Sequence, residues 1–173
     1  FAGDLGPIYG AQWRNWKGID QIYKAINTLK DNKYSRRIVI SAWNVEDLPK
    51  MALPPCPMVW QLIYHKDKLS IIVYQRSCDL ALGAPFNIVE ATLLCRTIAG
   101  ICNLKCGELK YIMGHCHLYE NQIDQMKTLI TRETTEFPTL YTSNIRNIDT
   151  IKATNFAIGK YTPNPSLQIP FAI

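Results

Sequence analysis

The sequence has no long hydrophobic run. No apolar stretch in its 173 residues reaches the roughly 18 residues that a membrane-spanning helix needs. The segment Phe1-Ala2-Gly3-Asp4 has neither the basic start nor the apolar centre of a secretory signal. Because the first residue is not methionine, we expect the chain to be a piece of a longer polypeptide. These features predict a chain that has no membrane span and lies in the cytoplasm. For a viral protein this would be the host cytoplasm.

Charge of one sign is nowhere concentrated. The 19 lysines and arginines outnumber the 14 aspartates and glutamates, giving a formal net charge of +5. No block of five or more like charges occurs. Diffuse positive charge attracts nucleotides and other small polyanions as readily as nucleic acid. Aromatic residues do not alternate with basic ones, so we expect no DNA binding.

The six cysteines include no Cys-x-x-Cys pair. In a chain with 47% hydrophobic residues, which can bury a core, this favours reduced thiols over a disulfide framework. A zinc site could be drawn from five neighbouring residues, but their spacing matches no common zinc module. These five are Cys102, Cys106, His115, Cys116 and His117.

Cys56 differs from the other cysteines because Pro54, Pro55 and Pro57 surround it. Proline fixes φ and carries no amide hydrogen, so the backbone at this thiol is restricted. Local features alone favour a small buried residue in a turn, with a positioned nucleophile as the alternative. About twenty residues further on, Gln75-Arg76-Ser77-Cys78-Asp79 has the composition of an anion-binding cluster.

Hydrophobic periodicity predicts one α+β domain over residues 1–173, without a repeat or a linker. The Asn87–Ile101 segment is apolar on most sides, so we expect that helix to be buried in the core. Helices are predicted from the N-cap Asp20 to about Asp31, over Asn87–Ile101 and over Asn121–Glu133; strands are predicted over Arg37–Trp43, Val59–Tyr64, Leu69–Arg76 and Glu108–His117.

Several blocks, taken in order, resemble the thymidylate synthase family. They are Leu5–Arg14, Ser35-Arg36-Arg37, Met51–Cys56, Gln75–Asn87, His117-Leu118-Tyr119 and Ile169–Ile173. Each block alone is weak, but the ordered set covers nearly the whole chain. The resemblance implies an α+β sandwich whose large β-sheet forms a homodimer interface. It also implies that roughly the N-terminal third of a typical member is missing, so we expect little activity from these residues alone.

The resemblance implies transfer of one carbon from 5,10-methylenetetrahydrofolate to C5 of deoxyuridylate (dUMP). Cys56 matches the nucleophile, and its attack on C6 converts the ring into an enolate that reacts at C5. Arg76 matches the cation that favours the thiolate. Tyr9 matches the tyrosine implicated in removing the C5 proton through ordered water.

The remaining site residues follow from the same match. Asn87 would read the uracil edge, because an amide can accept from N3–H and donate to O4. Gln75, Arg76 and Ser77 belong to the dUMP site, where Arg76 and Ser77 hold the phosphate. Arg36 and Arg37 would reach the phosphate from the other subunit, and His117 and Tyr119 would bond the 3′-hydroxyl. Asp79 would contact the pterin, with Leu82, Gly83, Phe86 and the terminal Ile173 facing the folate.

Three residues depart from the family pattern and keep alternatives open. Pro57 and Gln122 stand where histidine is common, and His115 stands where aspartate is common. These changes favour the alternative of a dUMP hydroxymethylase, in which water rather than hydride adds to the new carbon. A domain without catalysis that binds nucleotides or RNA is the other alternative. We expect methylation, and Asn87 favours uracil over cytosine.

Overall fold

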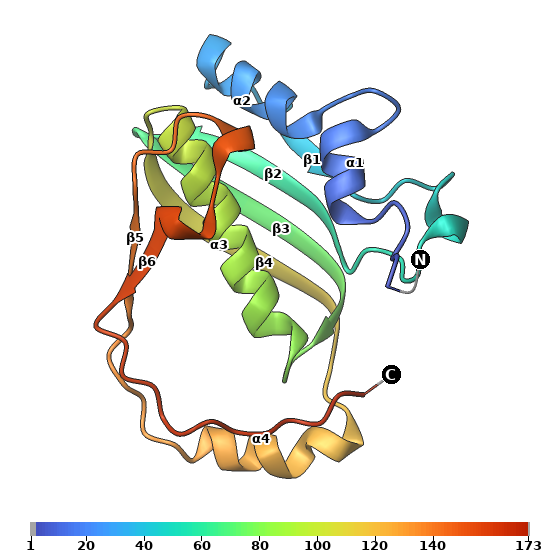
Figure 1. Ribbon diagram of the computed structural model, residues 1–173, viewed down its shortest axis with the longest axis vertical. Coiled ribbons are helices and arrows are strands. Elements are labelled where there is room, and N and C mark those ends of the chain that lie inside the picture. Colours follow the sequence, from blue (N-terminus) through green and yellow to red (C-terminus); the bar gives the residue numbers. More distant parts are fainter. Residues whose placement is uncertain (1–2, 173) are drawn as a thin grey trace.

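A computed structural model describes residues 3–172 of the chain, and a four-stranded sheet forms its centre (Figure 1). The strands are β1 (Val39–Ser41), β2 (Pro57–His65), β3 (Lys68–Asp79) and β4 (Lys105–His117), in the spatial order β1-β2-β3-β4. The first three strands are antiparallel neighbours, whereas β4 lies parallel to β3. Lys66 and Asp67 both have positive φ and form a tight polar turn between β2 and β3.

The helix α3 (Gly83–Ile101) connects the parallel strands β3 and β4 and covers one face of the sheet (Figure 1). It begins before the predicted Asn87, because Pro85 falls in the first turn, where a missing N–H is tolerated. The expected burial on most sides is wrong. Ala91 and Ile98 are buried, but Phe86 is 75% exposed and Val89 is 56% exposed.

The core lies between α3, the sheet and the helix α2 (Gln21–Asp31). Asp20 caps α2 as predicted, since its side chain accepts a hydrogen bond from the Tyr23 N–H at 2.9 Å. A shorter helix, α1 (Tyr9–Asn15), packs against α2 and brings Trp13 to the edge of this core. The result confirms the predicted α+β class.

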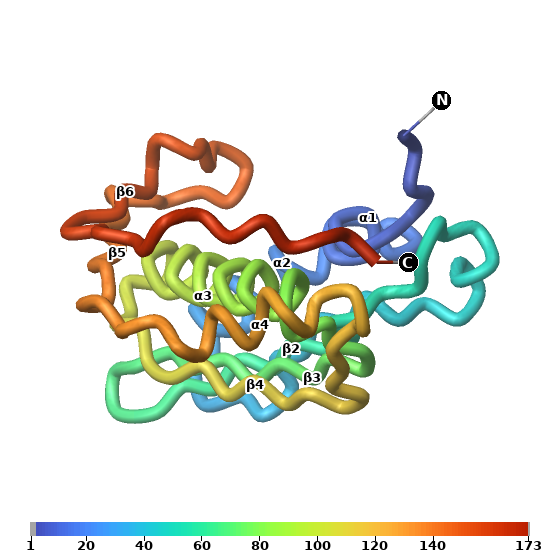
Figure 2. The backbone as a smooth tube through the Cα atoms, turned by 90° about the horizontal axis from the view of Figure 1, so that it is seen from below, coloured from blue at the N-terminus to red at the C-terminus, as the bar shows by residue number. Residues whose placement is uncertain are grey.

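The C-terminal part runs back along the outside of the molecule. The helix α4 (Ile123–Ile130) follows a 3-10 turn at Glu120–Gln122, so the predicted 121–133 helix is shorter than expected. An antiparallel ribbon of β5 (Thr139–Thr142) and β6 (Phe156–Gly159) comes next. The final segment then lies alongside α4 in both views (Figures 1 and 2). The fully buried Gln122 ties it down by donating to the Pro170 carbonyl at 3.1 Å.

The sheet face opposite α3 is not covered by residues 3–172. Along each strand, the side chains on this face alternate with side chains that point into the core. Four of the exposed ones are large and apolar, namely Val39, Ile63, Tyr74 and Ile112. We call this surface the open face. No helix in the described part of the chain is long and apolar enough to cross a membrane.

Candidate active site

Cys56 lies half-buried in the bend that precedes β2, and Arg76 of β3 holds this bend in place. The Arg76 guanidinium donates to the Pro55 carbonyl at 2.9 Å and to the Pro54 carbonyl at 2.7 Å. Its Nη2 lies 3.9 Å from the Cys56 sulfur, and the Arg76 N–H donates to the Cys56 carbonyl at 2.9 Å. The thiol is therefore held beside the Arg76 guanidinium.

Tyr9 of α1 contacts the same bend. Its hydroxyl oxygen accepts a hydrogen bond from the Cys56 N–H at 2.8 Å. Burial raises the pKa of Tyr9 to about 12, so the phenol stays protonated near neutral pH. Tyr9 is thus suited to orient Cys56 and to donate its own proton to a ligand or a water, rather than to act directly as a base.

A chain of amide contacts links β3 to the start of α3. The buried Gln75 donates through Nε2 to the Ser77 carbonyl at 2.7 Å and to Asn87 Oδ1 at 3.3 Å. Its Oε1 accepts from the Tyr111 hydroxyl of β4, whose pKa is raised by burial and which therefore remains a donor. Gln75, which the sequence placed among substrate-binding residues, has its amide engaged within the protein and holds Asn87.

The carboxyl ends of β3 and β4 lie at one edge of the sheet because these strands are parallel. Ser77 is opposite His115, and Asp79 is opposite His117. The His115 and His117 Nδ1 atoms are 3.2 Å apart. The His117 and Tyr119 rings pack edge-to-face at 5.1 Å between centroids, although β4 ends at His117. Tyr119 therefore lies beyond the strand, and the two predicted sugar-binding rings are nevertheless in contact.

The residues predicted to face the folate lie between β3 and α3. Asp79 Oδ1 accepts from the Ala81 and Leu82 N–H groups at 2.9 and 3.3 Å, which fixes the turn into the helix. A Cβ on Gly83 would meet Asp79 Cβ at 3.4 Å, an ordinary contact, so packing within the protein does not itself require glycine there. Phe86 projects into solvent, while Ile173 lies outside the described residues.

Arg36 and Arg37 lie away from this chain's own Cys56. They are exposed and separated only by Ile38 from β1, whose Val39 pairs with Gln61 of β2. Cys56 precedes the opposite end of β2. At about 3.3 Å per residue, the separation along the strand is roughly 20 Å. The structure thus does not bring these arginines together with the thiol.

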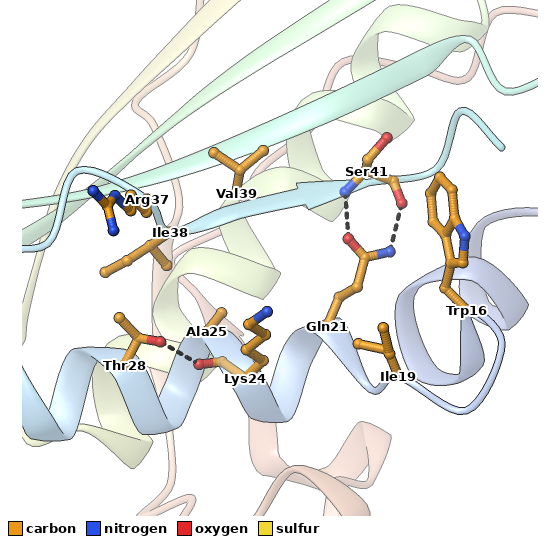
Figure 3. Close-up of a pocket in the computed structure, with 10 residues that line it drawn as sticks. All are labelled: Trp16, Ile19, Gln21, Lys24, Ala25, Thr28, Arg37, Ile38, Val39 and Ser41. Carbon is orange, nitrogen blue, oxygen red and sulfur yellow. Dashed lines mark hydrogen bonds between the residues drawn. The ribbon is translucent and has the colours of Figure 1, made fainter.

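A pocket of about 360 Å³ between α2 and β1 is also separate from the thiol (Figure 3). Gln21 crosses it and exchanges two hydrogen bonds with the Ser41 backbone, at 2.7 and 2.9 Å. Arg37 lines this pocket, but Cys56 and Arg76 do not. The pocket therefore belongs to the α2–β1 junction rather than to the candidate active site.

Sequence reasoning missed Glu90, which lies three residues after Asn87 and so on the same side of α3. Burial raises the pKa of the Glu90 carboxyl, and its contact with Asn87 opposes this effect. Its charge also raises the pKa of Tyr9 and of Tyr111, among other causes. The i, i+3 spacing from Asn87 was the available sequence signal for this acidic neighbour.

We expect Glu90→Gln to raise the free energy of unfolding at pH 7. Because the folded state raises the Glu90 pKa, ionised Glu90 opposes folding at neutral pH, and this cost disappears once pH falls below the ordinary value of 4.5. Urea unfolding at pH 7 and at pH 4 measures the effect. The exposed Glu108→Gln is the matched control. An equal stability change at both pH values would show that the Glu90 charge is not responsible.

The fixed thiol, the adjacent guanidinium and the polar edge of β3 and β4 together define a thiol-type candidate active site. The thymidylate synthase family model matches residues 1–173. The chain is 43% identical to the thymidylate synthase of Malacoplasma penetrans over 99% of its own length and 60% of that protein. It is 41% identical to that of Saccharomyces cerevisiae and 40% identical to that of Herpesvirus ateles, each over 99% of this chain and 64% of the relative.

The chain belongs to the thymidylate synthase family. It spans between 60% and 64% of the length of these curated relatives.

Proposed function

We propose that the protein containing this chain converts dUMP into thymidylate (dTMP), with 5,10-methylenetetrahydrofolate as the carbon donor and reductant. The observation that carries this proposal is the position of Asn87 relative to the thiol. Gln75, which holds Asn87, pairs with Pro57, the residue directly after Cys56. A pyrimidine whose edge bonds Asn87 would thus present its ring close to the Cys56 sulfur.

The polarity of the amide chain favours uracil. The Ser77 carbonyl can only accept, so the Gln75 amide nitrogen must face it and also donate to Asn87 Oδ1. This contact fixes the direction of the Asn87 amide. Its second Oδ1 lone pair and the Nδ2 hydrogen that does not face Glu90 remain for a ligand. Uracil offers N3–H as a donor and O4 as an acceptor, which matches this arrangement. Cytosine presents the reverse pattern.

Cys56 would open the reaction as a thiolate. Its sulfur forms a bond to C6, and the ring electrons move through C5 to O4, giving an enolate that is nucleophilic at C5. After C5 has bonded to the new carbon, its proton leaves, with Tyr9 orienting the water that receives it. The bond between the new carbon and the folate nitrogen would then break, and the folate would deliver a hydride to that carbon. Cleavage of the sulfur–C6 bond would release Cys56 and restore the C5–C6 double bond.

Several residues fit a folate beside the nucleotide. Asp79 uses Oδ1 within the turn, which leaves Oδ2 available to a pterin N–H. Leu82 and the exposed Phe86 supply apolar surface, and the room at Gly83 suits the approach of a flat ring. The C-terminal segment, held through Gln122, would close over the folate and exclude water.

We further propose a homodimer that uses the open face. Its exposed Val39, Ile63, Tyr74 and Ile112 form an apolar surface that a second copy would bury. Arg36 and Arg37 lie beside this sheet and roughly 20 Å from their own thiol, which suits donation to the partner's phosphate site.

Product analysis of the complete protein with dUMP and methylenetetrahydrofolate tests the proposal. We expect dTMP and dihydrofolate in equal amounts, with dCMP as an unreactive control substrate. Formation of 5-hydroxymethyl-dUMP with tetrahydrofolate would instead identify a hydroxymethylase. Binding of dUMP without any product would indicate a domain without catalysis, and either of these two results would overturn the proposed methylation.

A further inference from the structure

Two cysteines outside the candidate active site are in contact between α3 and β4. The sulfurs of Cys95 and Cys106 are 3.7 Å apart, and the Cys95 sulfur also lies 3.3 Å from the Leu69 carbonyl oxygen. Cys95 is buried at 2% exposure, while Cys106 is only half-buried. Leu69 lies near the start of β3 and Arg76 near its end, so this pair is far from Cys56 along the strand.

The surroundings make the two thiols chemically different. The contact with Cys95 lowers the pKa of the Cys106 thiol, and the Arg96 charge and the Gly107 N–H lower it further, against the effect of burial. The same contact and burial raise the pKa of Cys95. Within residues 3–172, the buried Nε of Arg96 has no hydrogen-bond partner. Cys106 is therefore the more nucleophilic sulfur, and Cys95 is a neutral neighbour within reach.

The local backbone keeps Cys106 at this position. The pairing of β3 with β4 shifts register directly after Leu69 and Cys106, which marks a bulge in β4. A Cβ on Gly107 would lie 2.4 Å from Ser70 Oγ and 3.1 Å from the Leu69 carbonyl oxygen, so a larger residue after Cys106 would require its neighbours to shift. A disulfide needs a sulfur–sulfur distance of about 2.05 Å, so an approach of roughly 1.7 Å remains.

We propose that Cys95 and Cys106 form a reversible redox pair that peroxide oxidises to a disulfide. The Cys106 thiolate attacks hydrogen peroxide, the O–O bond breaks, and hydroxide leaves a sulfenic acid on Cys106. The Cys95 sulfur then attacks the Cys106 sulfur, and the oxygen departs as water with the Cys95 proton. The two thiols lose two electrons and the peroxide gains them. A dithiol reductant reverses the reaction. This proposal for Cys95 and Cys106 does not depend on the function proposed for the Cys56 site.

Peptide mapping of the oxidised protein tests this pair. The purified protein is treated with hydrogen peroxide, its remaining thiols are alkylated, and it is digested with trypsin without reductant. Cleavage after Arg96, Lys105 and Lys110 leaves Cys106 alone in segment 106–110 and Cys102 alone in segment 97–105. We expect segment 106–110 to be linked to segment 77–96, and the link to disappear after dithiothreitol. Fragment ions distinguish Cys95 from Cys78 within segment 77–96.

Three variants sharpen the result. In Cys95→Ser, the sulfenic acid on Cys106 lacks its partner, so we expect dimedone to label Cys106. In Cys106→Ser, dimedone labelling of Cys95 should be absent, and Cys102→Ser should form the cross-link as the unchanged protein does. The proposal would be overturned if the unchanged protein formed no cross-link, or a Cys78–Cys116 cross-link instead. It would also be overturned if dimedone labelled Cys102 and Cys106 equally in Cys95→Ser.

Discussion

Cys56→Ser should reduce dTMP formation by about 10⁴-fold or more, because removal of a nucleophile eliminates the covalent route. A serine hydroxyl is far less acidic than a thiol, and neither Arg76 nor Tyr9 provides a base that would ionise it. The Tyr9 pKa of about 12 leaves that phenol protonated and unable to accept the serine proton near neutral pH. Substrate binding should change little, since serine fills nearly the same volume and keeps the backbone contact with Tyr9.

The measurement combines steady-state turnover with intact-mass analysis after incubation with 5-fluoro-dUMP and methylenetetrahydrofolate. The unchanged protein should gain the mass of a covalent ternary adduct, and Cys56→Ser should gain none. Cys102→Ser is the matched control, because Cys102 is half-buried at the end of α3 and its thiol contacts only the Ile26 carbonyl in the described structure. An adduct on the Cys56→Ser protein would assign the nucleophile to another residue.

The sequence was sufficient where a local pattern determines structure. Asp20 predicted the start of α2, since a side-chain acceptor directly before a periodic apolar run is typical of a helix N-cap. Hydrophobic periodicity predicted β2 and β3 to within a few residues. The start of α3 was not predictable in the same way. Gly83-Ala84-Pro85 resembles a loop, and only the fixed turn at Asp79 shows that the helix begins there.

Contacts between distant segments account for what the sequence could not show. Nothing local to Gln75 indicates that its amide is buried between Asn87 and Tyr111, because those partners are 12 and 36 residues away. Gln122, noted only as a departure from the family pattern, is fully buried and holds Pro170, 48 residues further on. Periodicity also overstated the burial of α3, since it cannot show whether the Phe86 side of an apolar helix is covered.

Pro57 illustrates how a departure from the family pattern fits this structure. It is the buried first residue of β2, paired with Gln75, and the register shifts directly after it. Proline cannot donate a hydrogen bond and is tolerated at the first residue of a strand or at a bulge. At this position it adds rigidity to the bend around Cys56 without interrupting the sheet. Three prolines and the hydrogen bonds from Arg76 thus together hold the backbone of Cys56 in place.

Arg76→Lys should lower kcat/KM for dUMP by about 100-fold, because hydrogen bonds to charged groups are worth about 1.5–3 kcal/mol each. The guanidinium already donates to the Pro54 and Pro55 carbonyls and approaches the Cys56 sulfur through Nη2, so its Nη1 hydrogens are not used by these contacts and could bind the substrate phosphate. A lysine ammonium keeps the charge but is a single point donor that cannot span both carbonyls and an anion. The loss should therefore appear in KM for the nucleotide as well as in kcat.

Two comparisons distinguish this geometric role from a loss of charge alone. Arg146→Lys is the matched control, since Arg146 is exposed and forms no ion pair within residues 3–172. The rate of alkylation of Cys56 by iodoacetamide reports on the exposure and reactivity of the sulfur, and it should change in Arg76→Lys because the bend loses its contacts with the guanidinium. If kcat, KM and this alkylation rate all match those of the unchanged protein, a positive charge alone is sufficient. The planar guanidinium of Arg76, with its several donors, would then have no role in positioning the nucleophile.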